Sequence, residues 1–306
     1  MRRGNQSRKR CKVHGGADAV QPSPSPSPPL PDTNAGWCTE LLTPKLTIAD
    51  NAMLVVVDMQ KDFITGSLSA PGAQAILVPR IVRLIEAFER KPIILTRDAH
   101  PEGHCSFESE AKPGFPEHCI QGKDGSRLDD TIWKAVQNRG GKTIHAFKGY
   151  MQNQDSFSAF PYTDGHALSK GLRKNDIYLE GGSLAATGAL CLKEECNAKA
   201  DANANNIVSP TTAELTASAG EYEPINDVLT NGILSKCDTI YVCGLVADYC
   251  VLDTAVMAKV NFPNKTVVYL SSYTRPSGVW SIVGHDPLII RDTLHDADVE
   301  LTNAMC

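Results

Sequence analysis

The feature that most constrains the fold is an alternation between short, continuous apolar runs and stretches whose apolar residues recur at helical spacing. Apolar runs lie at 53–58, 92–98, 142–148, 238–244 and 265–270, and helical spacing is found at 78–88, 250–260 and 286–294. A continuous apolar run of this length indicates a strand buried on both faces. Strands that alternate with helices predict an α/β fold, a three-layer sandwich with a mainly parallel, doubly wound sheet.

Two segments stand apart from this pattern. Residues 1–47 contain alternating Pro and Ser, which cannot form a core, so we expect a disordered arm there. Residues from about 163 to 223 are polar and rich in Ala and Asn, which predicts a surface insertion, dispensable for chemistry, with a short strand at 176–179. About 200 residues remain without these segments, which fits a single domain over 48–306.

Composition narrows the class of partner and the compartment. Lys and Arg number 30 against 35 Asp and Glu, and this net charge of −5 argues against nucleic acid or a membrane surface as a partner. No apolar run approaches the roughly 18 residues of a membrane span, and the basic amino terminus lacks the apolar stretch of a secretory signal. Ten cysteines then predict reduced thiols in the cytoplasm, with nuclear or organellar targeting left open.

Reactive side chains lie at the ends of the expected strands. A parallel sheet places its sites outside the carboxyl ends of its strands, and the residues at or just past four of those ends are Asp58, Asp98, Lys148 and Cys250. Each alone has an ordinary interpretation: an Asp caps helices, a Lys is solvated, and a Cys packs in a core. Together they predict one reactive rim.

Cys250 has the strongest local signal. It begins a helical pattern, and the positive end of a helix lowers the pKa of a thiol from about 8.5 toward neutrality. Lys148 would favour the thiolate further, Asp58 could move the proton, and the amides of the first turn could bind an oxyanion. Cys243 lies in the middle of an expected strand and is interpreted as packing.

The second constellation follows the strand that ends at Asp98. Asp98 and His100 share one face of an extended chain, and His104 and His118 come from the following loop. Such a group of one carboxylate and three imidazoles predicts a metal site, and a polar loop with surface histidines is the alternative. His145 and His285 are interpreted as structural.

At these residues a family resemblance is plain. The motifs VDMQKDF at 57–63, TRDAHP at 96–101, PEHC at 116–119 and GLVADYCV at 244–251 resemble nicotinamidases of the isochorismatase-like cysteine hydrolase superfamily. The resemblance implies an isochorismatase-like fold and a metal-dependent amidohydrolase that converts nicotinamide to nicotinate and ammonia through a cysteine thioester, in NAD salvage. The implied cofactor is one divalent metal ion, zinc first, with iron or manganese as alternatives. The 163–223 insertion is not part of the family pattern.

The resemblance also implies residue roles. The catalytic triad is Asp58, Lys148 and Cys250, and the oxyanion donors are the amides of Ala247 and Cys250, beside a cis peptide at Val246–Ala247. The metal ligands are Asp98, His100 and His118, with His104 as a further ligand or a partner of the ligands. Phe63 and Phe157 line the ring pocket. Phe115 is also expected in the pocket wall. Phe115 and Ala99 both stand where family members commonly have Trp, so the wall is expected to differ from that of the family.

Two other functions stay open from the sequence. Another amide or ureido hydrolase of the superfamily would differ in its need for a metal, and a non-catalytic binding or scaffold protein would release no ammonia. The expected partner is the small molecule nicotinamide, and a homo-oligomer is left open.

Overall fold

A computed structural model describes residues 46–108, 114–162, 183–184, 188–192, 206–217, 221–231, 234–278 and 287–302. All of these residues belong to one compact unit. Most of the expected arm, the expected strand at 176–179 and His285 lie outside the described residues.

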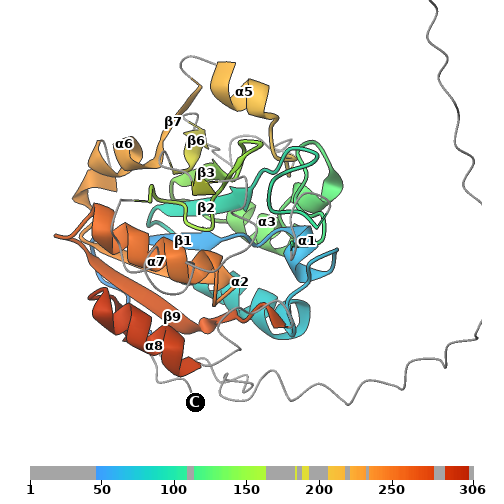
Figure 1. The fold of residues 1–306 in the computed structure, drawn as a ribbon. Helices are drawn as coiled ribbons and strands as arrows, with labels where there is room; N and C mark the ends of the chain where they lie inside the picture. Colours follow the sequence, from blue (N-terminus) through green and yellow to red (C-terminus); the bar gives the residue numbers. More distant parts are fainter. Residues whose placement is uncertain are drawn as a thin grey trace, which may run out of the picture. The chain divides into compact units, whose positions relative to one another are not determined.

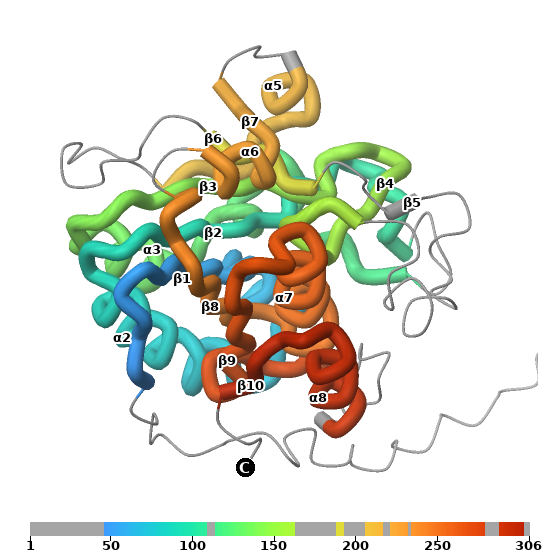
Figure 2. The backbone as a smooth tube through the Cα atoms, turned by 90° about the vertical axis from the view of Figure 1, so that its left-hand side faces the viewer, coloured from blue at the N-terminus to red at the C-terminus, as the bar shows by residue number. Residues whose placement is uncertain are grey.

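The core of the fold is an eight-stranded sheet with the order β10-β9-β8-β1-β2-β3-β6-β7 (Figures 1 and 2). Six strands run parallel, namely β1 (Ala52–Val57), β2 (Ile93–Asp98), β3 (Thr143–Lys148), β8 (Thr239–Leu245), β9 (Thr266–Arg275) and β10 (Glu300–Thr302). The two antiparallel strands are β6 (Leu190–Leu192) and β7 (Tyr222–Pro224). The α/β class and the mainly parallel sheet predicted from the apolar runs are confirmed.

The order of the strands decides where a site can form. From β1 the chain continues to β2 and β3 on one side, and it later returns to β8 and β9 on the other. Val55 of β1 pairs with Ile94 on one side and with Val242 on the other, and all six residues of β1 are buried. The order in which the chain adds strands therefore reverses between β1 and β8, and a ligand-binding crevice is expected at the carboxyl ends of these two strands.

Helices cover both faces of the sheet, as Figure 2 shows. On one face lie α2 (Val78–Ala87) and α3 (Asp130–Asn138), and on the other α7 (Cys250–Asn261) and α8 (Pro287–Asp296). Asp129 caps α3, because its carboxylate accepts hydrogen bonds from the amides of Thr131 and Ile132. Every residue of α7 from Cys250 to Ala258 is buried, and the helix packs against β8 and β9. No helix in the described ranges is long and apolar enough to cross a bilayer.

The remaining elements are short. The helical ones are α1 (Lys61–Ile64), η1 (Ala73–Leu77), η2 (Asp124–Ser126), α5 (Thr212–Ala217), α6 (Ile225–Thr230) and η4 (Leu234–Lys236). Strands β4 (Gln154–Asp155) and β5 (Ser183–Leu184) form a separate two-stranded sheet.

The described part of the insertion contributes to the main sheet, in contrast to the expected surface excursion. Strand β6 pairs with β3, with Ala146 opposite Cys191, and β7 pairs with β6. Ala189, Cys191 and Ser209 are fully buried. The polar composition of the segment hid these contacts, because its strands have only three residues each and show no periodicity.

Candidate active site

The structure brings the four strand-end residues into one buried cluster. Asp58 follows β1, Asp98 and Lys148 end β2 and β3, and Cys250 begins α7 just beyond β8. The Lys148 ammonium lies 2.9 Å from Asp58 Oδ2 and 3.5 Å from Cys250 Sγ, and it donates a hydrogen bond to Asp98 Oδ1. All four residues are at most 4% exposed, so these charges interact with little screening by solvent.

Asp58 is held in a conformation suited to a base. Its φ of 48° is left-handed, a region that costs a non-glycine residue about 1–3 kcal/mol and is concentrated at functional sites. The Thr96 hydroxyl donates to Asp58 Oδ1 at 2.7 Å, whereas Oδ2 accepts no directed hydrogen bond and is only paired with Lys148. Burial raises the pKa of Asp58 to about 6, although the Lys148 charge opposes the rise. Asp58 can therefore exchange a proton near neutral pH.

The thiol of Cys250 differs from the expectation of a lowered pKa. Burial raises its pKa well above the usual value, Lys148 lowers it, and the carboxylates of Asp58 and Asp98 raise it again. The helix terminus and one ammonium do not offset the loss of water around the sulfur. Because the resting thiol keeps its proton, it needs a base, and carboxylate oxygens of Asp58 and Asp98 lie within 4.8 Å of the sulfur.

Lys148 itself stays charged. Burial alone would lower its pKa, but the carboxylates of Asp58 and Asp98 raise it well above the usual value. Its ammonium also donates to the carbonyl of Ser156 at 3.1 Å. Lys148 is thus a fixed positive charge beside the sulfur.

The expected oxyanion donors need a correction of one residue. The cis peptide is Leu245–Val246, not Val246–Ala247. The amide of Ala247 donates to the Arg275 carbonyl at 2.7 Å and is not available to a substrate. In the described part of the chain, the amides of Val246 and Cys250 donate to no protein acceptor, and both residues line the cavity. The pair of available donors is therefore Val246 and Cys250.

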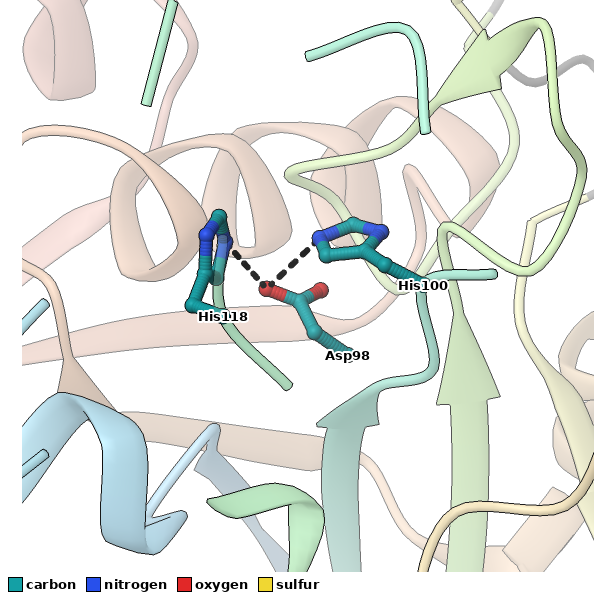
Figure 3. Close-up of side chains that lie close together, drawn as sticks. All are labelled: Asp98, His100 and His118. Atoms are coloured by element: carbon teal, nitrogen blue, oxygen red, sulfur yellow. Dashed lines mark ion pairs between the residues drawn. The ribbon is translucent and has the colours of Figure 1, made fainter. Parts of the chain in front are cut away.

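Asp98, His100 and His118 present three ligand atoms to one point (Figure 3). Asp98 Oδ2 lies 3.5 Å from Nε2 of His100 and 3.9 Å from Nε2 of His118. Nδ1 of His100 donates to the Gly149 carbonyl at 2.8 Å, and Nδ1 of His118 donates to the Pro116 carbonyl at 2.7 Å. These two hydrogen bonds orient both rings with Nε2 toward the carboxylate. Histidines that ligate a metal typically donate the other ring nitrogen's hydrogen to a protein acceptor in this way. The donor set fits a divalent metal ion.

The protonation of these groups also suits a metal. Burial and the neighbouring His100 lower the pKa of His118 to about 4, so its ring is neutral and can ligate. Burial would raise the pKa of Asp98, but Lys148 and the histidines hold it well below its usual range. Burial would lower the pKa of His100, but Asp98 raises it.

His104 lies behind His100 and not beside Asp98. Its ring stacks on that of His100 with the centroids 4.1 Å apart. Nδ1 lies 2.7 Å from the Ser106 hydroxyl, and Nε2 donates to the Gln154 carbonyl at 3.1 Å. Both ring nitrogens thus have protein partners, which makes His104 a support for His100.

A cavity opens over the cluster between the aromatic side chains that the sequence selected. Phe63, Phe115 and Phe157 line it, and Phe115 and Phe157 both pack against Tyr249, with centroids 5.6 and 5.1 Å apart. The cavity also exposes residues that sequence reasoning missed, namely Leu68, Ser106, Asp155, Val246, Tyr249 and Ser277. Val246 and Tyr249 stand inside the motif around Cys250, so their proximity to Cys250 in the sequence was an available signal. Leu68 and Ser277 carried none.

Two residues interpreted as structural lie away from the cavity. His145 is buried in β3, where its Nδ1 accepts from Arg97 at 3.1 Å, and burial lowers its pKa well below the usual value. Cys243 is buried in β8, with its sulfur 3.7 Å from the Val55 carbonyl.

Comparison with known proteins agrees with this geometry. Residues 52–184 match the family model described as the Isochorismatase domain. The nicotinamidase of Saccharomyces cerevisiae is 33% identical over 134 residues, 35% of this chain and 61% of that protein. The nicotinamidase of Acinetobacter baylyi is 32% identical over 142 residues, 41% of this chain and 63% of that protein. The chain thus spans a little under two thirds of the length of these relatives.

The fold is shared with a solved structure over most of both chains. PnC1 from L. infantum, in complex with nicotinate, superposes with a TM-score of 0.54 at 24% identity, over 84% of this chain and 96% of that one. The fold of this chain is thus shared with PnC1, and residues 52–184 resemble the Isochorismatase domain in sequence.

Proposed function

We propose that the protein is a nicotinamidase, which hydrolyses nicotinamide to nicotinate and ammonia. The observation that carries this proposal is the adjacency of two groups at one cavity. The first group is Asp58, Lys148 and Cys250, which would supply the base, the positive charge and the nucleophile. The second is the proposed metal-ligand group, and it adjoins the first because Lys148 also donates a hydrogen bond to Asp98. Two curated nicotinamidases at 32% and 33% identity support the choice of substrate.

The first half of the reaction uses the buried cluster. Asp58 takes the thiol proton of Cys250, and the sulfur attacks the carboxamide carbon of nicotinamide. The oxyanion that forms accepts hydrogen bonds from the amides of Val246 and Cys250. Lys148 stabilises the negative charge on the sulfur and on Asp58. The C–N bond then breaks, and Asp58 returns the proton to the departing ammonia.

The second half releases the acid. Asp58, again ionised, takes a proton from a water molecule, whose oxygen attacks the thioester carbon. The C–S bond breaks, the proton on Asp58 returns to the sulfur of Cys250, and the product leaves as nicotinic acid, which loses its proton to solvent to give nicotinate. A base with a pKa of about 6 can serve both half-reactions near neutral pH.

Asp98, His100 and His118 would hold the metal. When bound, the ion supplies a Lewis-acidic position for the ring nitrogen of the substrate. Carboxylate and imidazole donors suit zinc first, with iron and manganese as alternatives. Phe63 and Phe157 border the cavity and would contact the faces or edge of the pyridine ring. Such an enzyme recycles nicotinamide in NAD salvage, and we place it in the cytoplasm.

Ammonia release decides the proposal. The purified chain, loaded with Zn²⁺, is assayed with nicotinamide and with benzamide, which has the same amide but no ring nitrogen. We expect turnover of nicotinamide, loss of that turnover after chelation and recovery on adding Zn²⁺. Equal turnover of both amides without metal would favour another amide hydrolase, and no ammonia from either would favour a binding protein.

A further inference from the structure

One serine of the insertion contacts the main chain of Asp98, the last residue of β2. Ser209 is fully buried and lies in a segment beyond residue 184, where the family match ends. Its hydroxyl donates to the main-chain carbonyl of Asp98 at 2.9 Å, across 111 residues of sequence. Ser209 also lies outside the four motifs that carry the family resemblance.

All three polar groups of Ser209 are used. Besides the hydroxyl bond, its amide donates to the Ser126 hydroxyl at 2.9 Å, and its carbonyl accepts from the Gly122 amide at 3.0 Å. Ser209 thus joins the end of β2 to the loop that follows His118. The first segment ends in Asp98, and the second follows directly after His118, so both adjoin the proposed ligands.

Asp98 is held at its main chain from two sides. The Gln60 side chain accepts from the Asp98 amide at 2.7 Å and donates to its carbonyl at 2.8 Å, and Ser209 fills the second position on that carbonyl. Gln60 also donates to the Ser126 carbonyl at 2.9 Å. Removing the Ser209 hydroxyl would leave a buried carbonyl with one donor where it now has two.

Neighbouring contacts of the same segment point to the same place. The Ile207 carbonyl accepts from Arg97 Nη1 at 2.7 Å, one residue before Asp98. The Thr212 amide donates to Gln121 Oε1 at 3.0 Å, and Gln121 Nε2 donates to the Ala99 carbonyl at 2.7 Å, one residue after Asp98. Residues 207–212 therefore brace both flanks of Asp98.

We propose that Ser209 is a positioning residue of the metal site: its hydroxyl fixes Asp98 and ties the β2 end to the loop after His118. The affinity for the metal then depends on a residue that touches neither metal nor substrate. This inference rests on the metal site of the proposed function.

The test compares two Ser→Ala variants. In Ser209→Ala the lost hydroxyl bond braces Asp98. In the matched control Ser271→Ala, the lost hydroxyl bond is also 2.9 Å long, runs to the Thr302 carbonyl, and joins β9 to β10 at the far edge of the sheet. Zn²⁺ dissociation constants are measured by competition with a chromogenic chelator, and thermal unfolding is recorded on the metal-free proteins.

We expect Ser209→Ala to weaken Zn²⁺ binding about 10-fold, the low end for partners that orient metal ligands, while Ser271→Ala binds as wild type. Ser209→Thr keeps the hydroxyl, and Ser209→Val has the same shape without it, so Thr should bind more tightly than Val even if Ser209→Ala does not fold. The proposal is overturned if Ser209→Ala binds Zn²⁺ as tightly as wild type and Ser209→Val binds it as tightly as Ser209→Thr. A wild-type protein that binds no Zn²⁺ would instead overturn the metal site itself.

Discussion

Two regions form the surroundings of the site, and different contacts hold them in place. One is the rim, made by Asp58, Asp98 and Lys148 at the carboxyl ends of β1, β2 and β3, and the other is segment 206–212 of the insertion. On the rim, strand register does the work: Asp98 and Lys148 are direct partners in the β2–β3 ladder, and the Asp58 amide bonds to the Thr96 carbonyl of β2. Segment 206–212 contains no strand and is held beside Asp98 by hydrogen bonds such as that of the Ser209 side chain. Reactive residues that strand register brings together can be predicted from the sequence. A residue such as Ser209, which a loop brings to them from a distant part of the chain, cannot.

The largest effect should come from the rim, in Cys250→Ala. Without the sulfur no thioester forms, so we expect ammonia release from nicotinamide to fall by at least about 10,000-fold. Thermal unfolding and Zn²⁺ affinity should stay close to wild type. Cys243→Ala is the control, because Cys243 is buried in β8 away from the cavity and its loss should leave the rate within a few-fold. Continued ammonia release by Cys250→Ala would remove the proposed mechanism.

The second test removes the other region. Replacing residues 163–223 with a short linker turns β3 into an edge strand and deletes buried Cys191 and Ser209. We expect a loss of about 3 kcal/mol or more in the free energy of unfolding, which lowers the unfolding temperature by about 10 °C, and little retained metal.

This expectation reverses the one drawn from composition, that the insertion is dispensable. As a control, residues 193–205 are replaced by a Gly/Ser segment of equal length, which removes none of the contacts described above. A full deletion that unfolds at the wild-type temperature with wild-type Zn²⁺ affinity would show that the two regions are independent.

A third test concerns His118, one of the proposed metal ligands. His118→Ala removes one of the three clustered ligand atoms, and we expect Zn²⁺ affinity to fall about 100-fold, with nicotinamide hydrolysis reduced at limiting metal. His295→Ala is the control, since this side chain is 87% exposed on α8. The chelator competition described for Ser209 measures both. Unchanged metal binding in His118→Ala would exclude this residue as a ligand.

The smallest effect is expected from Thr96→Val, which compares one hydroxyl on the rim with the hydroxyl of Ser209. The Thr96 hydroxyl bonds to ionised Asp58 and lowers its pKa from where burial alone would put it. Its loss should raise that pKa above about 6, so the acid limb of kcat/KM moves to higher pH.

The rate of Thr96→Val near neutral pH should fall only a few-fold, and its Zn²⁺ affinity should not change. Ser209→Ala should show the reverse, with weaker Zn²⁺ binding and an unmoved acid limb at saturating metal. Profiles of kcat/KM against pH for both variants measure this contrast. A common phenotype would mean that the two hydroxyls support one rigid unit.

Much of the fold and of the rim could be predicted from the sequence. Five apolar runs marked the long parallel strands, and the rule that sites form at their carboxyl ends selected Asp58, Asp98, Lys148 and Cys250 before any coordinates. Strands β6, β7 and β10 escaped notice because each has three residues, too few to show a period. The oxyanion donor was misplaced by one residue, because which amide is free depends on the bond from Ala247 to Arg275.

The sequence by itself determined the sheet, its parallel direction and the set of reactive side chains, because apolar periodicity and strand ends are local properties of a chain. Only the tertiary structure decided how those side chains behave. Burial outweighs the helix terminus and raises the pKa of Cys250, and it sets the pKa of Asp58 at about 6. The tertiary structure also brought Ser209 to Asp98, because loss of solvent and contacts between distant residues arise only when the whole chain packs.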